Sequence, residues 1–520
     1  MRKGNPPRSP VLLLAGVVTG LFQCAPGSAH TLIFKVYDRD GNLYSFAEFR
    51  DVAACAERGG WDGDALIDPA DLTIVQAWPM YNAGGLPAFD FDTGPVALCI
   101  PWPTRDTGYS TLIIDCGGAG FVAGGTYVFN HVAAEDYWRR LSDALVARPD
   151  YRPSVAFARH RDAAESELLA ARAADTDSAR GMHGQRALNE IALAFETLLA
   201  DYGVQRGRRR VAAGEVLWWG VTIDRTDNYT SVLDSVAALV AGTDARMYVR
   251  IVFDEFVPAA DYGPIVSYAQ GLGLHVVGEI LDSAAMDQYT LAEFQARVVE
   301  YVDGLPGVEV WEIGNEVNGE WLGGDVDAKI EYAAAYVKQV DPDDTTLLTL
   351  FWQIGTGEPA SAVFDWAAAH VSPGLLGNVD VIGLSIYVGT APLGLAFDQV
   401  VGRLLAMYPD QQFIISETDY WATDTTNVWW WRSQEAPGTT VRRQFLRQMY
   451  RAALGYDRSL SGVFWWNYCT EMDPGGDLWN ALRALIECVH NGRCPPAISP
   501  AIESSKQPGA AARRGAVPVP

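Results

Sequence analysis

Two glutamates follow apolar runs that are typical of buried strands. Glu316 comes directly after the run at 310–315, and Glu417 comes directly after the run at 413–416. A pair of carboxyl groups can divide two roles, because a protonated carboxyl donates to a leaving oxygen while an ionised carboxylate attacks or stabilises a cationic carbon. Cleavage of a glycosidic bond requires this chemistry, so Glu316 and Glu417 are the first candidates for a catalytic pair.

Three other residues have side chains suited to the same reaction. Arg250 closes a further apolar run and can hold a carboxylate in its ionised form by ion pairing. Tyr387 closes another run and can hydrogen-bond the same carboxylate. Asn315 precedes Glu316 and carries an amide that can bind a sugar 2-hydroxyl, a contact that strengthens in the transition state.

The elements that must position these residues form a repeating pattern after Arg210. Eight apolar runs alternate with helical stretches, and the runs start near Val216, Met247, Leu274, Val308, Thr345, Val379, Gln412 and Gly462. Their spacing of about 27 to 50 residues fits a strand, a crossover helix and two loops. We therefore predict a (β/α)8 barrel of the α/β class, with a doubly wound open sheet as the alternative fold.

A barrel of this kind explains why the candidate residues lie at the ends of runs. Catalytic groups in such barrels come from the C-terminal ends of the strands. Strands four and seven lie roughly opposite one another, so Glu316 and Glu417 are expected to face each other across the mouth. Other carboxylates also follow runs, namely Asp254, Glu255, Glu279, Asp282 and Glu320, and we interpret them as loop charges. Glu312, inside the fourth run, is expected to be structural.

The motifs around both glutamates resemble those of the glycoside hydrolase clan A barrels, which are retaining enzymes. The segment 314–316 is similar to the acid/base signature of the clan, and 415–418 is similar to its nucleophile strand. Within the clan, the segments 380–387 and 462–466 are most similar to strands of the family 53 endo-β-1,4-galactanases. The sequence departs from that family at Asn467, where a glutamate is usual.

The resemblance implies a role for each matching residue. Glu316 would be the acid/base, Glu417 the nucleophile and Asn315 the ligand of the 2-hydroxyl. Trp466 would be the aromatic platform beneath the reacting sugar, and Arg250 matches the strand-two arginine of the clan.

Tryptophan is abundant, with 17 residues in the chain. Flat apolar rings suit the C–H faces of sugars, and core packing is the alternative for each ring. Besides Trp466, the rings that we expect to contact substrate are Trp219, Trp321, Trp352 and Trp421. The unbroken triplet 429–431 is a further candidate for the cleft.

The rest of the chain divides into segments of different composition. Residues 1–29 have the basic start, apolar stretch and small residues of a signal peptide. The alternatives are a short membrane anchor and a lipoprotein signal at Cys24. Residues 30–132 show the short runs and turns of a β-sandwich-like domain, and 133–210 form a helical connector. The barrel covers 211–494, and 495–520 form a disordered tail. The short interval between Cys488 and Cys494 indicates a local disulfide.

The net charge of −25 excludes binding to nucleic acid. The seven histidines show no metal-site or triad spacing, so we expect no metal and no cofactor. We expect a secreted or periplasmic monomer without a transmembrane segment, acting on a polysaccharide or oligosaccharide substrate. The alternative is a carbohydrate-binding barrel without hydrolytic activity and with an adhesive β-domain. Whether residues 30–132 bind sugar or serve only in packing stays open.

Overall fold

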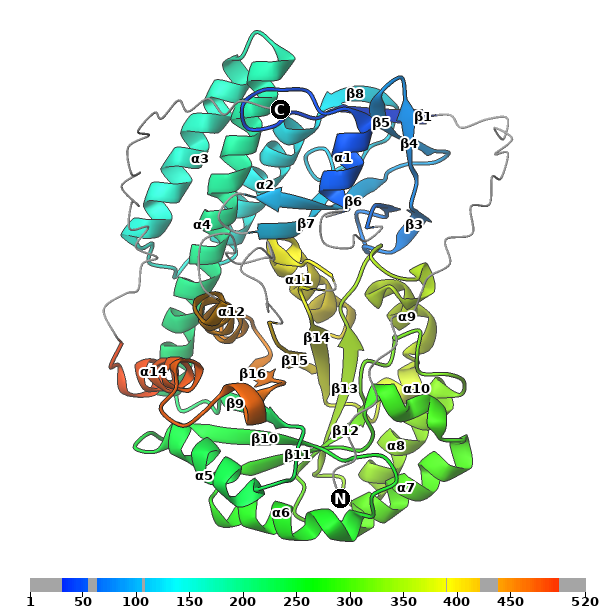
Figure 1. Cartoon of the computed structure of the whole chain (residues 1–520), viewed down its shortest axis with the longest axis vertical. Coiled ribbons are helices and arrows are strands. Elements are labelled where there is room, and N and C mark those ends of the chain that lie inside the picture. The colour runs from blue at the N-terminus through cyan, green and yellow to red at the C-terminus, as the bar shows by residue number, and fades with distance from the viewer. Residues whose placement is uncertain (1–29, 55–62, 105–107, 390, 421–437, 495–520) are drawn as a thin grey trace, which may run out of the picture.

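The computed structural model describes residues 30–54, 63–104, 108–389, 391–420 and 438–494. The expected signal peptide, the tail, Trp421 and the triplet 429–431 lie outside these residues. Within them, the chain forms an N-terminal domain of sheets and helices followed by a closed barrel (Figure 1).

The N-terminal domain contains two four-stranded sheets, with strand orders β4-β5-β1-β8 and β3-β2-β6-β7. The strands are β1 (His30–Lys35), β2 (Ala65–Ile67), β3 (Ile74–Ala77), β4 (Met80–Ala83), β5 (Leu86–Phe91), β6 (Ala97–Thr104), β7 (Gly108–Ile114) and β8 (Gly125–Val128). The helices are α1 (Phe46–Ala53), α2 (Phe129–Val146), α3 (Val155–Ala173) and α4 (Asp177–Ala212). All pairs of neighbouring strands are antiparallel except β1 and β8, which are parallel.

The helices α2 to α4 complete the core of this domain. Phe34 and Trp102 from the two sheets are buried in one cluster with Phe129 of α2 and Leu188 of α4. The α4 helix then continues along the side of the barrel, where it packs against α12 and α14 (Figure 1). At Gly203 a Cβ would lie 1.8 Å from the backbone oxygen of Arg451, so only glycine permits this close crossing. The helices expected to form a connector thus contribute to the core of the N-terminal domain, and α4 also packs against helices of the barrel.

Eight parallel strands close the barrel in the order β10-β11-β12-β13-β14-β15-β16-β9. The strands are β9 (Trp218–Ile223), β10 (Arg246–Val252), β11 (His275–Glu279), β12 (Val310–Gly314), β13 (Thr345–Phe351), β14 (Val381–Ile386), β15 (Gln412–Thr418) and β16 (Ser459–Trp465). The α-helices around it are α5 (Tyr229–Val240), α6 (Ala259–Gly271), α7 (Leu291–Gly304), α8 (Val326–Val340), α9 (Val363–His370), α10 (Pro373–Leu376), α11 (Phe397–Met407), α12 (Gly438–Ala453), α13 (Tyr468–Glu471) and α14 (Asp477–Asn491). The prediction of a (β/α)8 barrel is confirmed.

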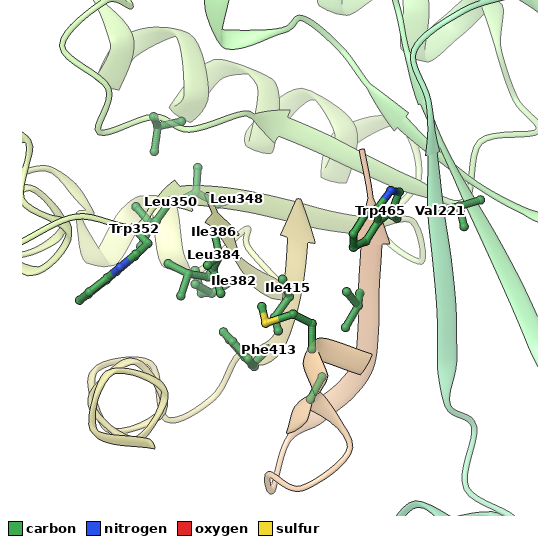
Figure 2. Packing of buried hydrophobic residues seen from close by; sticks show 14 of the residues in the cluster. Val221, Leu348, Leu350, Trp352, Ile382, Leu384, Ile386, Phe413, Ile415 and Trp465 are labelled. Carbon is green, nitrogen blue, oxygen red and sulfur yellow. The ribbon is translucent and has the colours of Figure 1, made fainter. Parts of the chain in front are cut away.

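Successive side chains of each barrel strand point alternately inward and outward, which gives two separate apolar layers. Inside the barrel, a single buried layer takes one side chain from each strand, from Trp218 on β9 to Phe464 on β16. Outside it, side chains such as Leu384 and Ile415 pack in the large cluster that joins the strands to the helices (Figure 2). The polar residues of the site lie beyond this inner layer, toward the C-terminal end of the barrel, because they come later on the same strands or just after the strands end.

The N-terminal domain rests on loops that follow β13 and β14. The backbone N–H of Thr111 on β7 donates to the carbonyl of Leu393 at 3.2 Å. The indole N–H of Trp78 donates to the carbonyl of Gly355 at 3.1 Å. These loops leave the C-terminal ends of their strands, so the domain touches the side of the barrel that carries the candidate site.

The predicted local disulfide between Cys488 and Cys494 is confirmed. Among the described residues, no helix combines the length and the apolar character that a membrane span requires.

Candidate active site

Glu316 occupies a tight turn directly after β12. Its φ is +45°, a left-handed conformation that is rare and costly for a residue other than glycine. The turn is held by the backbone N–H of Val317, which donates to the carbonyl of Thr349 at 3.0 Å. The amide of Asn318 also bridges to Phe351, donating to its carbonyl at 2.8 Å and accepting from its N–H at 2.6 Å. Contacts with the neighbouring strand β13 therefore maintain the strained turn.

The carboxyl group of Glu316 is surrounded by hydroxyl groups. Ser385 donates to Oε1 at 2.6 Å, and Ser283 donates to Oε2 at 3.2 Å. The residue is only 8% exposed. Burial, followed by the nearby charge of Glu417, raises the pKa of Glu316 to about 8, although both serines act in the opposite direction. This carboxyl therefore holds its proton to a higher pH than an ordinary glutamate does.

Glu417 near the end of β15 has a different set of partners. The hydroxyl of Tyr387 donates to Oε1 at 2.6 Å, and the side-chain amide of Asn315 donates to Oε2 at 3.1 Å. The guanidinium of Arg250 lies 3.0 Å from the same Oε2. Burial raises the pKa of Glu417 to about 7, while Arg250 and Tyr387 oppose the rise. Three groups therefore favour the ionised form of this carboxyl.

Arg250 on β10 is the centre of the buried polar network. Its Nε donates to Oε2 of Glu312 at 2.6 Å, and its Nη2 lies 3.0 Å from Oε2 of Glu279. Arg250 is fully buried, and its guanidinium carbon lies 5.3 Å from the ring centroid of Trp466. This distance is typical of a cation–π contact and places Trp466 beside the cation that pairs with Glu417.

Glu312 and Asn315 fix the geometry of the network. Thr349 donates to Oε1 of Glu312 at 2.5 Å. The Oδ1 atom of Asn315 accepts from the backbone N–H of Ser283 at 3.2 Å, so the orientation of its amide toward Glu417 is set. Glu312 is thus structural in the sense that it holds Arg250 in place.

The structure brings together Glu316, Glu417, Asn315, Arg250 and Tyr387, and the ring of Trp466 contacts Arg250. The sequence predicted these six residues from strand endings and from the resemblance. Their arrangement provides one carboxyl held by hydroxyls and one held by a cation, a tyrosine and an amide.

Two of the tryptophans expected to contact substrate are buried in the core, which corrects the prediction. Trp219 is 1% exposed on the outer face of β9, where its indole N–H donates to His490 Nε2 at 2.9 Å. Trp352 is also 1% exposed and lies in the apolar cluster shown in Figure 2, with its indole N–H directed to the carbonyl of Pro392 at 3.3 Å. Neither ring has surface left for a sugar.

Trp321 differs from these two because its ring remains partly free. It is 39% exposed in the loop that follows Glu316, and its ring packs edge-on against Phe351 at a centroid distance of 5.6 Å. Among the described tryptophans predicted to bind sugar, Trp321 is exposed and Trp466 is half-buried, whereas Trp219 and Trp352 are buried.

Sequence reasoning missed several residues of the network. Glu279 was interpreted as a loop charge, but it is fully buried against Arg250. Ser385 carried a usable signal, because it lies two residues before Tyr387 and therefore shares its inward face. Ser283 lies in the short helix η2 (Ser283–Gln288), outside any strand, and its position had no signal in the sequence.

Comparison with protein-family models and with curated proteins finds no match. The solved structures to which this chain is similar include several glycoside hydrolases. A GH113 β-1,4-mannanase is 13% identical with a TM-score of 0.37, over 52% of this chain and 98% of that one. A GH10 xylanase from Bispora sp. MEY-1 is 13% identical with a TM-score of 0.37, over 55% and 99%. A structure from a study of two fungal β-1,4-galactanases is 15% identical with a TM-score of 0.32, over 50% and 86%.

Proposed function

We propose that this chain is an exported retaining glycoside hydrolase of clan A that cleaves β-linked polysaccharide at internal bonds. The observation that carries the proposal is the contrast between two buried glutamates at the ends of β12 and β15. Glu316 receives hydrogen bonds from two neutral hydroxyls at a buried position that raises its pKa to about 8, whereas Glu417 is paired with Arg250. The retaining mechanism requires this division between an acid and a nucleophile.

In the first step, Oε of Glu417 attacks the anomeric carbon while Glu316 gives its proton to the departing glycosidic oxygen. The bond to the leaving sugar breaks, and an ester forms between the glycosyl group and Glu417. In the second step, Glu316 takes a proton from water, whose oxygen attacks the same carbon and releases Glu417 as a carboxylate. The two inversions leave the product in the β configuration.

The neighbouring residues have defined tasks in this reaction. Arg250 and Tyr387 stabilise the carboxylate of Glu417 before attack and after release. Asn315 is placed to bind the 2-hydroxyl of the sugar, and Trp466 to support its apolar face. Trp321 in the loop after β12 is available to an adjoining sugar unit, which fits a substrate longer than one residue.

The test is release of reducing sugar from a panel of β-1,4 and β-1,3 glycans that includes mannan, xylan and galactan. Wild type is expected to hydrolyse at least one of them, and Glu417→Ala none. Glu320→Ala, which changes an exposed carboxylate in the loop after Glu316, is the matched control and keeps full activity. Binding of glycans by wild type without hydrolysis would instead favour the carbohydrate-binding alternative.

A crystal structure offers a second test of the mechanism. We expect the carboxyl groups of Glu316 and Glu417 to be separated by about 5 to 5.5 Å, the distance of retaining enzymes. A separation well beyond about 6.5 Å would indicate an inverting mechanism.

A further inference from the structure

Three carboxyl groups surround one buried cation in the barrel. Glu279, Glu312 and Glu417 each have an oxygen within 3.0 Å of the guanidinium of Arg250. Arg250 and Glu279 are 0% exposed, Glu312 is 1% exposed and Glu417 is 5% exposed. Three ionised carboxylates on one guanidinium would leave two uncompensated negative charges in a buried cluster. Burial of unpaired charge is so costly that such groups take up protons instead.

The hydrogen bonds show which carboxyl takes the proton. Glu312 accepts from Thr349 and from Nε of Arg250, at 2.5 and 2.6 Å. Glu417 accepts from Tyr387 and Asn315 in addition to its ion pair with Arg250. Hydrogen bonds from donors stabilise the charged form of a carboxyl, so both of these groups are favoured as carboxylates.

Glu279 lacks this support. Within the described part of the chain, neither of its carboxyl oxygens accepts a hydrogen bond, and its contact with Arg250 Nη2 is an ion pair at 3.0 Å. The other charged groups that influence it are Glu312, Glu417 and Asp282, all of them acidic. Burial is the largest influence and raises the pKa of Glu279 well above its ordinary value, against the single favourable effect of Arg250.

We propose that Glu279 is a positioning residue held in its neutral, protonated form, so that Arg250 faces two carboxylates, those of Glu312 and Glu417, instead of three. The buried proton on Glu279 takes the place of one that would otherwise reside on the nucleophile. This inference rests on the proposed function, because it concerns the charge of the group that attacks the sugar.

The substitution Glu279→Gln distinguishes a neutral Glu279 from an ionised one. Glutamine has the shape of a protonated glutamate and no charge. If Glu279 is neutral, the acid limb of the pH profile, where the rate rises as Glu417 ionises, stays in place in E279Q, whatever the effect on the maximal rate. If Glu279 is ionised, E279Q removes a negative charge near Glu417 and moves that limb to lower pH by about one unit or more, which would overturn the proposal.

Glu312→Gln is the matched control, because Glu312 lies on the same guanidinium but is assigned as a carboxylate. E312Q is expected to move the acid limb to lower pH by about one unit or more, whatever its effect on the maximal rate. If the acid limb of the pH profile moves in E312Q and stays in place in E279Q, the result supports a neutral Glu279 and an ionised Glu312. Equal displacement in both variants would contradict it.

An infrared measurement decides the same question without any activity. The difference spectrum of wild type minus E279Q at pH 7 is expected to contain the C=O stretching band of a protonated carboxylic acid. A carboxylate band in its place would overturn the proposal. If E279Q does not fold, Glu279→Met, which has a similar volume and no carboxyl group, serves instead in the same difference spectrum. Failure to hydrolyse any glycan would remove the proposed function but leave this result valid.

Discussion

The hydroxyl of Tyr387 donates a hydrogen bond of 2.6 Å to Oε1 of Glu417, across neighbouring strands β14 and β15. Arg250 approaches the other oxygen of the same carboxylate from β10. The candidate nucleophile is therefore fixed from two sides by groups on rigid strands, and a preorganised site of this kind needs little rearrangement during reaction.

Removal of the tyrosine hydroxyl tests this relationship. In Tyr387→Phe the ionised form of Glu417 loses a donor, so its pKa rises and less of it is ionised at neutral pH. A hydrogen bond to a charged group contributes about 1.5 to 3 kcal/mol, which predicts a shift of the acid limb by about one to two pH units upward. The measurement is kcat/KM against pH, and an unmoved acid limb would show that the hydroxyl does not support the carboxylate.

Wild type should have a bell-shaped dependence of kcat/KM on pH. Glu417 must be ionised to attack, and its pKa of about 7 sets the acid limb. Glu316 must be protonated to donate, and its pKa of about 8 sets the basic limb. The optimum is therefore expected between these values, on the neutral to slightly alkaline side. A profile that falls steadily from pH 5 to pH 8 would contradict the assigned roles.

Chemical rescue tests the identity of the nucleophile. Glu417→Ala is expected to lose about 10⁴-fold or more in kcat, because no group remains to attack the anomeric carbon. The shortened side chain leaves space for azide, which should restore turnover and give a glycosyl azide of the α configuration. The product is identified by nuclear magnetic resonance. Rescue that yields the β azide would point to loss of the acid/base instead.

The raised pKa of Glu316 also has a consequence for stability. Above its unfolded value of 4.5 the unfolded chain releases this proton, while the folded chain retains it until about pH 8. The unfolded state thus binds fewer protons, so this group lowers the free energy of unfolding as pH rises through that interval. Glu316→Gln should remove the effect and be more stable than wild type by about 1 kcal/mol or more at pH 8. Denaturant unfolding at pH 5 and pH 8 measures it, and a variant less stable than wild type at pH 8 would refute it.

The predictable parts of the molecule were those with a periodic signal. The expected run starts at Thr345 and Gln412 coincide with the starts of β13 and β15, and the start near Val308 lies two residues before β12. Buried parallel strands are continuous apolar runs, so their order and spacing define the barrel. The residues that end these runs, including Glu316 and Glu417, could be named for the same reason.

The sequence does not show which side chains become buried when the strands close into a barrel and the helices cover it. Trp219 and Trp352 have the composition of sugar-binding rings, but the face of a strand on which a ring lies determines whether helices cover it. Glu279 ends a strand as an exposed loop charge does, and only the position of Arg250 on the adjacent strand shows that it is buried. The expectation of a helical connector over 133–210 does not include the packing of α2 to α4 against the N-terminal sheets, because helical periodicity does not reveal the sheet against which a helix packs.

The central claim is double displacement at Glu316 and Glu417. Its most direct test is proton nuclear magnetic resonance of the anomeric signals during the first minutes of hydrolysis of the best glycan from the panel. We predict that the β anomer of the new reducing end appears first and that the α anomer follows by mutarotation. Initial appearance of the α anomer would contradict the retaining mechanism.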